Sequence, residues 1–149
     1  MASDSHTWNL VFLQLLLEEL GHRVVNLGAC VPDELLVSEC RRIRPDLIVL
    51  SSVNGHGHHD GLRVIRRLRA CPELARTPAV IGGKLTIAGP GDPERQRSLL
   101  AAGFDGVFEE GRPVADFRAF VGALPAPSAP MAAVLPAALT VATASRVLR

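Results

Sequence analysis

A chain of 149 residues, 48% hydrophobic and 21% charged, is long enough to bury one core and too apolar to be disordered throughout. Its 16 basic and 15 acidic residues leave a formal net charge of +1, and aromatic residues are scarce, which argues against a nucleic-acid-binding surface. The first residues lack the pattern of a secretion signal, and no apolar run reaches the about 18 residues of a membrane span, so we expect neither export nor a membrane.

The apolar pattern predicts helices and strands in alternation. The first half predicts a buried helix from about His6 to Leu20, a strand over 23–28, a helix opened by Pro32 and an apolar strand over 46–52. The second half predicts a helix over 60–70, a strand over 77–83, a helix over 93–102, a strand over 106–108 and a helix over 114–124. Strict alternation with short connections predicts an α/β fold with a doubly wound parallel sheet.

The end of the chain has a different composition. Residues 125–149 are rich in Ala and Pro and contain neither Gly nor an acidic residue. We interpret this stretch as a linker or disordered tail, outside a folded domain that spans residues 1–124.

Three predicted strands end in small, polar or Gly-rich segments, which are 26–28, 51–55 and 82–84. The carboxyl ends of parallel strands meet at one edge of the sheet, where such folds bind ligands. Gly and Ser also terminate strands for purely structural reasons, and for any single segment that explanation is the simpler one. Three such segments at one edge favour a ligand site.

Asp4 and His6 lie two residues apart, just ahead of the predicted first helix. A carboxylate that accepts one ring N–H of an imidazole fixes its tautomer and makes the other nitrogen a better metal ligand. The alternative interpretation is an Asp that caps the helix beside a solvated His.

Together these segments resemble the cobalamin-binding domain family, in particular the small subunit of glutamate mutase (methylaspartate mutase). The segment 3–9 resembles the family's D-x-H-x-x-G signature, Ser51-x-Val53 its S-x-L element, and Gly82-Gly83 its G-G pair. The resemblance covers about residues 3–124 and implies a flavodoxin-like or Rossmann-like cobalamin-binding fold. Two residues depart from the pattern, since Asn9 replaces a Gly and Val53 replaces a Leu.

The resemblance implies a role for each matched residue. His6 would replace the cofactor's own benzimidazole as the lower cobalt ligand, and Asp4 would hold its outer nitrogen. The displaced nucleotide tail would enter between the sheet and the first helix, with Ser51 near its base. Gly82 and Gly83 would let the backbone approach the tail. The full set of implied cofactor-binding residues is Asp4, Ser5, His6, Thr7, Asn9, Ser51, Val53, Gly55, Gly82 and Gly83.

The implied function is an adenosylcobalamin-dependent mutase component that interconverts L-glutamate and 3-methylaspartate in the cytoplasm. No catalytic residue is expected on this chain alone, because a larger barrel subunit would supply the substrate pocket within a heterotetramer. Two alternatives remain open: a corrinoid carrier of methyl transfer, and a non-enzymatic cobalamin sensor domain.

The start of the chain departs from the expected fold. A strand inside the sheet should precede Asp4, but only three residues do, fewer than the ~5 of a usual strand. Either the natural start lies upstream of Met1, or the chain lacks its first strand and the sheet has a gap at its centre.

Two further groups of residues are candidates for metal or thiol chemistry. The segment 55–60 contains three His and one Asp and could bind zinc or nickel, although ligands this close rarely complete a tetrahedron. It could instead meet the cofactor or a partner. The cysteines have no Cys-x-x-Cys spacing, and we expect reduced thiols, with Cys40 and Cys71 packed on helices and Cys30 near the site without a partnered base.

Overall fold

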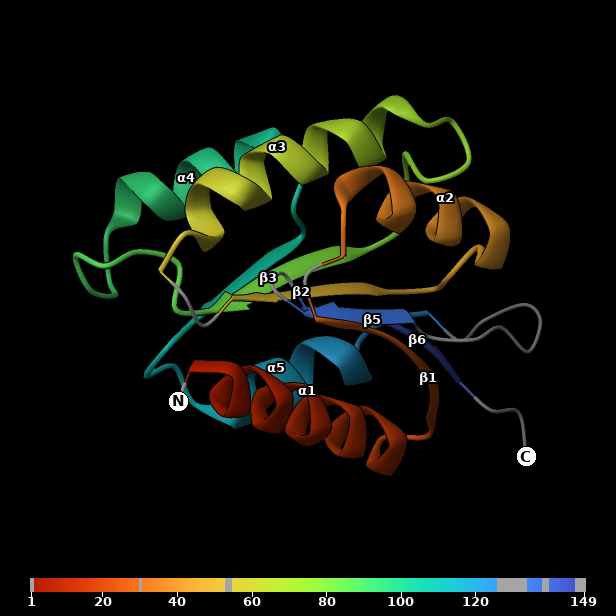
Figure 1. The fold of residues 1–149 in the computed structure, drawn as a ribbon, viewed down its shortest axis with the longest axis horizontal. Helices are drawn as coiled ribbons and strands as arrows, with labels where there is room; N and C mark the ends of the chain where they lie inside the picture. The colour runs from red at the N-terminus through yellow and green to blue at the C-terminus, as the bar shows by residue number, and fades with distance from the viewer. Residues whose placement is uncertain (1, 30, 53–54, 126–133, 138–139, 147–149) are drawn as a thin grey trace.

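The computed structural model describes residues 2–29, 31–52, 55–125, 134–137 and 140–146. Its elements are α1 (Ala2–Glu19), β1 (His22–Ala29), α2 (Asp33–Ile43), β2 (Ile48–Ser52), α3 (Gly57–Ala70), β3 (Ala79–Gly83), α4 (Pro93–Ala102), β4 (Gly106–Glu109), α5 (Val114–Gly122), β5 (Val134–Ala137) and β6 (Thr140–Arg146) (Figure 1). The predicted α/β class is confirmed, and the predicted elements occur in the predicted order through α5.

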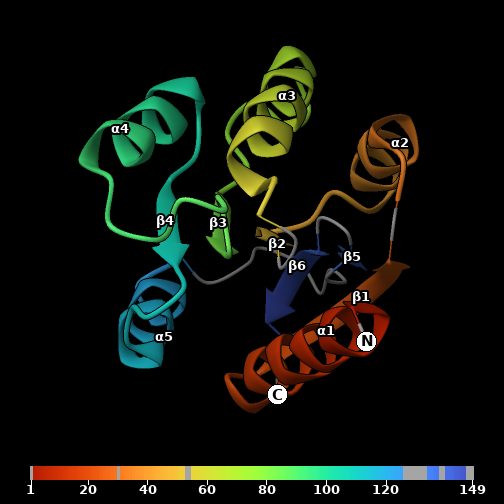
Figure 2. The same ribbon diagram turned by 60° about the vertical axis from the view of Figure 1, so that its left-hand side comes forward.

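The described strands form one sheet in the order β4-β3-β2-β6-β1-β5. Strands β2, β3 and β4 are parallel neighbours. Helices α2, α3 and α4 cover one face, and α1 and α5 cover the other (Figures 1 and 2). Two helical layers on one sheet explain the continuous apolar sequence of β2, whose residues are all buried.

The side chains of β2 alternate between two apolar cores. Ile48 and Leu50 belong to the core beneath α2, α3 and α4, whereas Val49 packs with Leu17 and Phe117 beneath α1 and α5. This alternation follows from the two-residue period of a strand. None of the described helices is both long and apolar enough to cross a membrane.

The C-terminal segment differs from the prediction, which placed residues 125–149 outside the fold. Strand β6 lies between β1 and β2 and runs antiparallel to both, and β5 pairs with the other edge of β1. Without β6, the facing edges of β1 and β2 would each leave backbone N–H and C=O groups without partners. The central position that was expected for a strand ahead of Asp4 is therefore occupied by the C-terminal strand.

Two helices begin earlier than predicted. Helix α1 begins at Ala2, so Asp4 and His6 lie within its first turns and not in a preceding loop. Ser and Asp are favoured near a helix N-terminus, and the segment 3–5 supplies both residue types. Helix α3 begins at Gly57 and not at Asp60, so the predicted histidine loop is partly the first turn of a helix.

Candidate functional site

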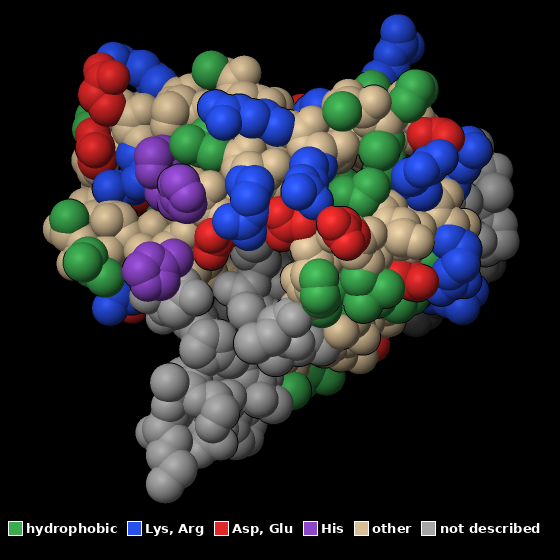
Figure 3. Space-filling view, turned by 45° about the horizontal axis from the view of Figure 1, so that its top comes forward, with side chains coloured by type: hydrophobic (Ala, Val, Ile, Leu, Met, Phe, Trp, Pro, Cys, Tyr) green, Lys and Arg blue, Asp and Glu red, His purple; other side chains and the backbone are tan. Residues whose placement is uncertain are grey.

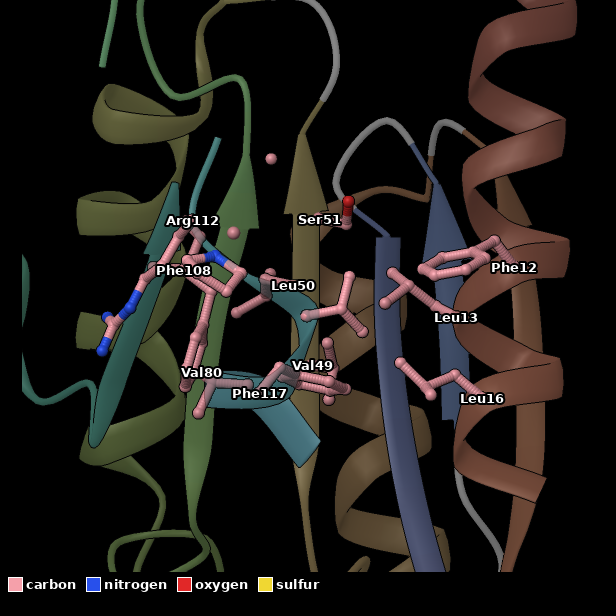
Figure 4. Close-up of a pocket in the computed structure, with 15 residues that line it drawn as sticks. Phe12, Leu13, Leu16, Val49, Leu50, Ser51, Val80, Phe108, Arg112 and Phe117 are labelled. Atoms are coloured by element: carbon pink, nitrogen blue, oxygen red, sulfur yellow. The ribbon is translucent and has the colours of Figure 1, made fainter. Parts of the chain in front are cut away.

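A cavity of about 120 Å³ lies between α1, α5 and the sheet, close to the carboxyl ends of the strands (Figure 4). It is lined by Phe12, Leu13, Leu16, Val49, Leu50, Ser51, Val80, Ile81, Gly82, Gly83, Phe108, Arg112, Pro113, Val114 and Phe117. Pockets that enclose a whole drug-sized ligand measure about 300–1,000 Å³. A cavity of this size and mainly apolar lining suits one ring system of a larger ligand.

Three residues predicted from the strand ends meet at this cavity. Ser51 on β2 pairs in register with Gly82 on β3, and Gly83 follows opposite Ser52. Ser51 is 5% exposed, and its hydroxyl lies among apolar walls at the carboxyl end of β2 (Figure 4). The parallel register therefore brings one polar group and two glycines to the same wall.

The two glycines are required by the sheet itself, and the expected role of making room for a ligand stays a prediction. A β-carbon on Gly82 would lie 2.5 Å from the carbonyl oxygen of Phe108, and one on Gly83 would collide with the carbonyl oxygen of Ser52. Gly83 also has φ +85, a conformation that L side chains rarely adopt. The close contacts are with the protein's own backbone.

The aromatic wall of the cavity was not predicted from the sequence. The Phe108 ring meets Phe117 and Phe120 edge to face, with centroids 5.4 and 5.7 Å apart. The Arg112 guanidinium lies 4.8 Å from the Phe108 centroid, and its Nε donates to Asp116 at 2.9 Å. Apolar spacing alone predicts a core position for Phe117, and nothing in the sequence separates a cavity wall from a filled core.

A buried ion pair fixes the loop that follows β3 at the same edge. Arg95 Nε donates to Glu109 Oε1 at 2.7 Å, and both side chains are less than a tenth exposed. The other Glu109 oxygen accepts from the Gly91 backbone N–H at 2.7 Å, and Arg95 donates to the Gly89 carbonyl at 2.8 Å. This pair holds the Gly-rich loop against α4 and β4, and it was not predicted from the sequence.

The other predicted site residues lie on other segments of the chain. Asp4, Ser5, His6, Thr7 and Asn9 lie on the first turns of α1. Gly55, with φ +83, lies against Ile87 of the loop after β3. A β-carbon on Gly55 would be only 2.7 Å from Ile87 Cγ2. Val53 and Cys30 lie outside the described residues.

The histidines at the start of α3 form no metal site. Across the described parts of the chain, no group of three or more His, Cys, Asp or Glu could hold a metal ion. His58 Nε2 lies 2.8 Å from Ser98 Oγ, and the backbone N–H of His58 donates to the Leu85 carbonyl. Burial, with a smaller contribution from Arg95, lowers the pKa of His58 below its ordinary value. His58 thus joins α3 to α4, and the zinc or nickel interpretation is not supported.

Cys40 is a buried core residue, as predicted. It belongs to the core beneath α2, α3 and α4, and burial raises the pKa of its thiol to about 12. A thiol with so high a pKa is not a nucleophile near neutral pH. Cys71 is partly buried at the end of α3 and packs against the same core.

The fold and the cavity define a class of protein: a doubly wound α/β domain with a small, mainly apolar cavity between its first helix and the carboxyl end of its sheet, the edge at which such folds bind ligands. Comparison with known families identifies which one. The chain belongs to the B12-binding domain family, whose profile matches residues 1–117. The resemblance that the strand-end motifs predicted is therefore confirmed.

The chain is similar to proteins with two kinds of name. The glutamate mutase sigma subunit of Treponema denticola is 30% identical over 118 residues, which cover 76% of this chain and 81% of that protein. The sigma subunit of Fusobacterium nucleatum is 28% identical over 118 residues, covering 76% and 83%. The HTH-type transcriptional repressor CarA of Myxococcus xanthus is 36% identical over 83 residues, covering 55% of this chain and 28% of the repressor.

Proposed function

We propose that this chain is the cobalamin-binding subunit of an adenosylcobalamin-dependent mutase that interconverts L-glutamate and 3-methylaspartate in the cytoplasm. The observation that carries the proposal is the cavity, in which Ser51 and the backbone of Gly82 and Gly83 meet α1 beside an aromatic wall. Its volume and apolar walls fit the benzimidazole end of a displaced nucleotide tail, and the Ser51 hydroxyl is the polar group within reach of a ring nitrogen.

The helix that forms one wall also carries the residues for the cobalt. His6 precedes the cavity residue Leu13 by two helical turns, so the two positions share a helix face about 10 Å apart along the axis. Helix α1 extends past the carboxyl ends of the strands (Figure 4). In this proposal His6 is the lower ligand of the cobalt and Asp4 holds the outer nitrogen of His6.

The chain's own contribution is binding and orientation. When bound, adenosylcobalamin supplies a cobalt–carbon bond whose homolysis starts a radical rearrangement. The cavity residues keep the tail away from water and fix its position relative to α1. The substrate pocket belongs to a larger barrel subunit with which this chain forms a heterotetramer. The names of the sigma-subunit relatives support the partner subunit.

Cofactor binding tests the proposal directly. Cobalamin bound by the 149-residue chain should give the spectrum of a displaced benzimidazole, and ¹⁵N-labelled His should change the hyperfine structure of the Co(II) electron paramagnetic resonance spectrum. His6→Ala should remove that hyperfine structure, while His59→Ala, an exposed histidine of α3, should keep it. An unchanged spectrum in cofactor-loaded His6→Ala would overturn the ligand assignment.

A second candidate function is a cobalamin-responsive sensor domain, favoured by the 36% identity with the CarA repressor. The two functions differ in their partner. Mutase activity on L-glutamate after mixing with a glutamate mutase large subunit supports the first. Tight cobalamin binding without complex formation or activity, together with a cofactor-dependent change in self-association, supports the second.

A further inference from the structure

A second concave surface lies between α2 and the C-terminal half of α3, on the face of the sheet opposite the cavity. We call it the arginine groove. It measures about 770 Å³, and its lining includes four arginines, Arg41, Arg42, Arg44 and Arg67, against the two carboxylates of Glu34 and Glu73. Figure 3 shows this helical face, where basic side chains gather with acidic ones between them. The lining therefore carries an excess of positive charge.

Arg44 occupies a backbone position that glycine would fill at lower energy. It follows α2 with φ 52 and ψ 65, in the left-handed region, and its backbone N–H donates to the Cys40 carbonyl at 2.8 Å. It is the one residue other than Gly with a positive φ among the described residues. Helices commonly end in this conformation with Gly, because a β-carbon there is unfavourable. An arginine at this position places a fourth guanidinium at the groove despite that strain.

Three of the four arginines of the groove are weakly engaged by the chain itself, whereas Arg42 forms an ion pair with Glu39 at 2.6 Å. Arg41 meets Glu73 across the groove at 3.4 Å, with more than half of the Arg41 side chain exposed. Arg67 Nε is 4.0 Å from Asp33, the outer limit of an ion pair. Arg44 makes no ion pair within the described part of the chain. Exposed pairs of this kind contribute little to stability, so these guanidinium groups remain open to another carboxylate.

We propose that the arginine groove docks an acidic peptide segment of a partner protein. Guanidinium groups bind carboxylates in bidentate pairs, and two helices present them from both sides. Val37 and Ala70 add an apolar surface for aliphatic side chains between the acidic ones. From Glu34 to Arg44 the helix rises about 15 Å, the span of a few extended residues.

The groove suits an acidic peptide better than a nucleic acid. Glu34 and Glu73 lie in the same groove and would repel a continuous phosphate backbone. The described residues that line the groove include no aromatic side chain on which a base could stack. A peptide can place its carboxylates beside the arginines and neutral residues beside the two glutamates.

Two variants separate docking from folding. The probe is a fluorescein-labelled peptide of alternating Glu and Leu, with a Gln-for-Glu peptide as its control. Arg44→Gly should raise Tm, because it removes the left-handed strain, and should weaken binding of the acidic peptide about tenfold. Arg67→Gln should weaken it similarly. Arg97→Gln, an exposed arginine of α4 paired with Glu94, should leave binding unchanged.

Other results would overturn the proposal. The proposal fails if the acidic peptide does not bind at low salt, or if the Gln peptide binds equally well. It also fails if all three variants lose affinity for the acidic peptide equally. Tighter binding of a single-stranded oligonucleotide of the same charge would assign the groove to nucleic acid. None of these measurements requires cobalamin, so the result stands apart from the proposed mutase function.

Discussion

Gly83 and Ser52 approach so closely that a β-carbon on Gly83 would collide with the Ser52 carbonyl oxygen. The same oxygen accepts the backbone N–H of Lys84 at 2.6 Å, and the Gly83 carbonyl accepts from Glu110. Gly83 thus closes the junction of β2, β3 and β4 at the edge where the cavity lies. Its need for glycine comes from the sheet before any cofactor binds.

We predict that Gly83→Ala destabilises the fold by more than about 3 kcal/mol, since backbone strain and a backbone collision add. Gly111→Ala is the matched control, because Gly111 has a similar φ of +89 and no atom within 4 Å of a β-carbon. That variant should lose only about 1 kcal/mol of unfolding free energy. Urea denaturation measures both values, and equal losses would mean that the collision is relieved by a small shift.

The fold was largely predictable because the burial of a strand leaves a pattern in its sequence. The continuous apolar stretch 46–52 indicated a strand covered on both faces, and β2 is buried throughout. The tail was not predictable in the same way. Its Ala- and Pro-rich composition resembles a linker, and only the unpaired edges of β1 and β2 explain why β6 pairs there.

The residues of the site that lie at strand ends were predictable from the sequence. The residues that belong to it through side-chain packing were not. Ser51 and Gly82 follow from the rule that parallel strands bring their carboxyl ends together. The Phe108 wall and the Arg95–Glu109 pair join residues of different elements, β4 with α5 and α4 with β4. No local pattern distinguishes such a buried pair from the many exposed Arg and Glu residues of this chain.

The buried ion pair gives a second prediction. Glu109→Gln should destabilise the protein by about 3 kcal/mol, because it leaves the Arg95 guanidinium buried without a charge partner. Hydrogen exchange at the Gly91 amide should become faster, since this N–H donates to Glu109.

Glu94→Gln serves as the control for that prediction. Glu94 pairs with Arg97 on the exposed surface of α4, with both side chains more than 70% exposed. Loss of this exposed ion pair should change the unfolding free energy by no more than about 0.5 kcal/mol. If Glu109→Gln and Glu94→Gln lower the unfolding free energy by the same small amount, water reaches Arg95 and the Arg95–Glu109 pair does not hold the loop.

The third prediction concerns pH. Burial keeps the pKa of His58 below its ordinary value of 6.5, so the unfolded chain takes up this proton more readily than the folded protein. The stability contributed by neutral His58 is therefore complete above about pH 7 and falls as the pH drops below the ordinary value. His58→Gln should flatten this part of the stability curve, measured by urea denaturation between about pH 7 and about pH 5.

His59→Gln is the comparison for the pH experiment. His59 is the next residue of α3 and is exposed. Its variant should retain most of the wild-type slope of stability against pH, because His59 lowers the pKa of His58 less than burial and Arg95 do. If the two variants have the same curve, burial of the His58 imidazole does not keep it neutral.

The last prediction tests whether the cavity takes the nucleotide tail. Leu13 lines the cavity from α1 and is only partly buried against the core beneath α1 and α5. In Leu13→Trp the larger ring should occupy much of the about 120 Å³ cavity and displace the tail. Affinity for cobalamin should fall at least about tenfold, while Tm stays close to the wild-type value because the cavity receives added apolar contacts.

Leu15→Trp provides the matched control, because Leu15 lies on the same helix, is 60% exposed and does not line the cavity. Its affinity for cobalamin should equal that of the wild type. Both affinities are measured by titration of the absorbance spectrum, which also reports whether the benzimidazole is displaced. Wild-type affinity and a displaced-base spectrum in Leu13→Trp would show that the tail lies elsewhere. A normal affinity without the displaced-base spectrum would show that cobalamin binds with its own benzimidazole still on the cobalt.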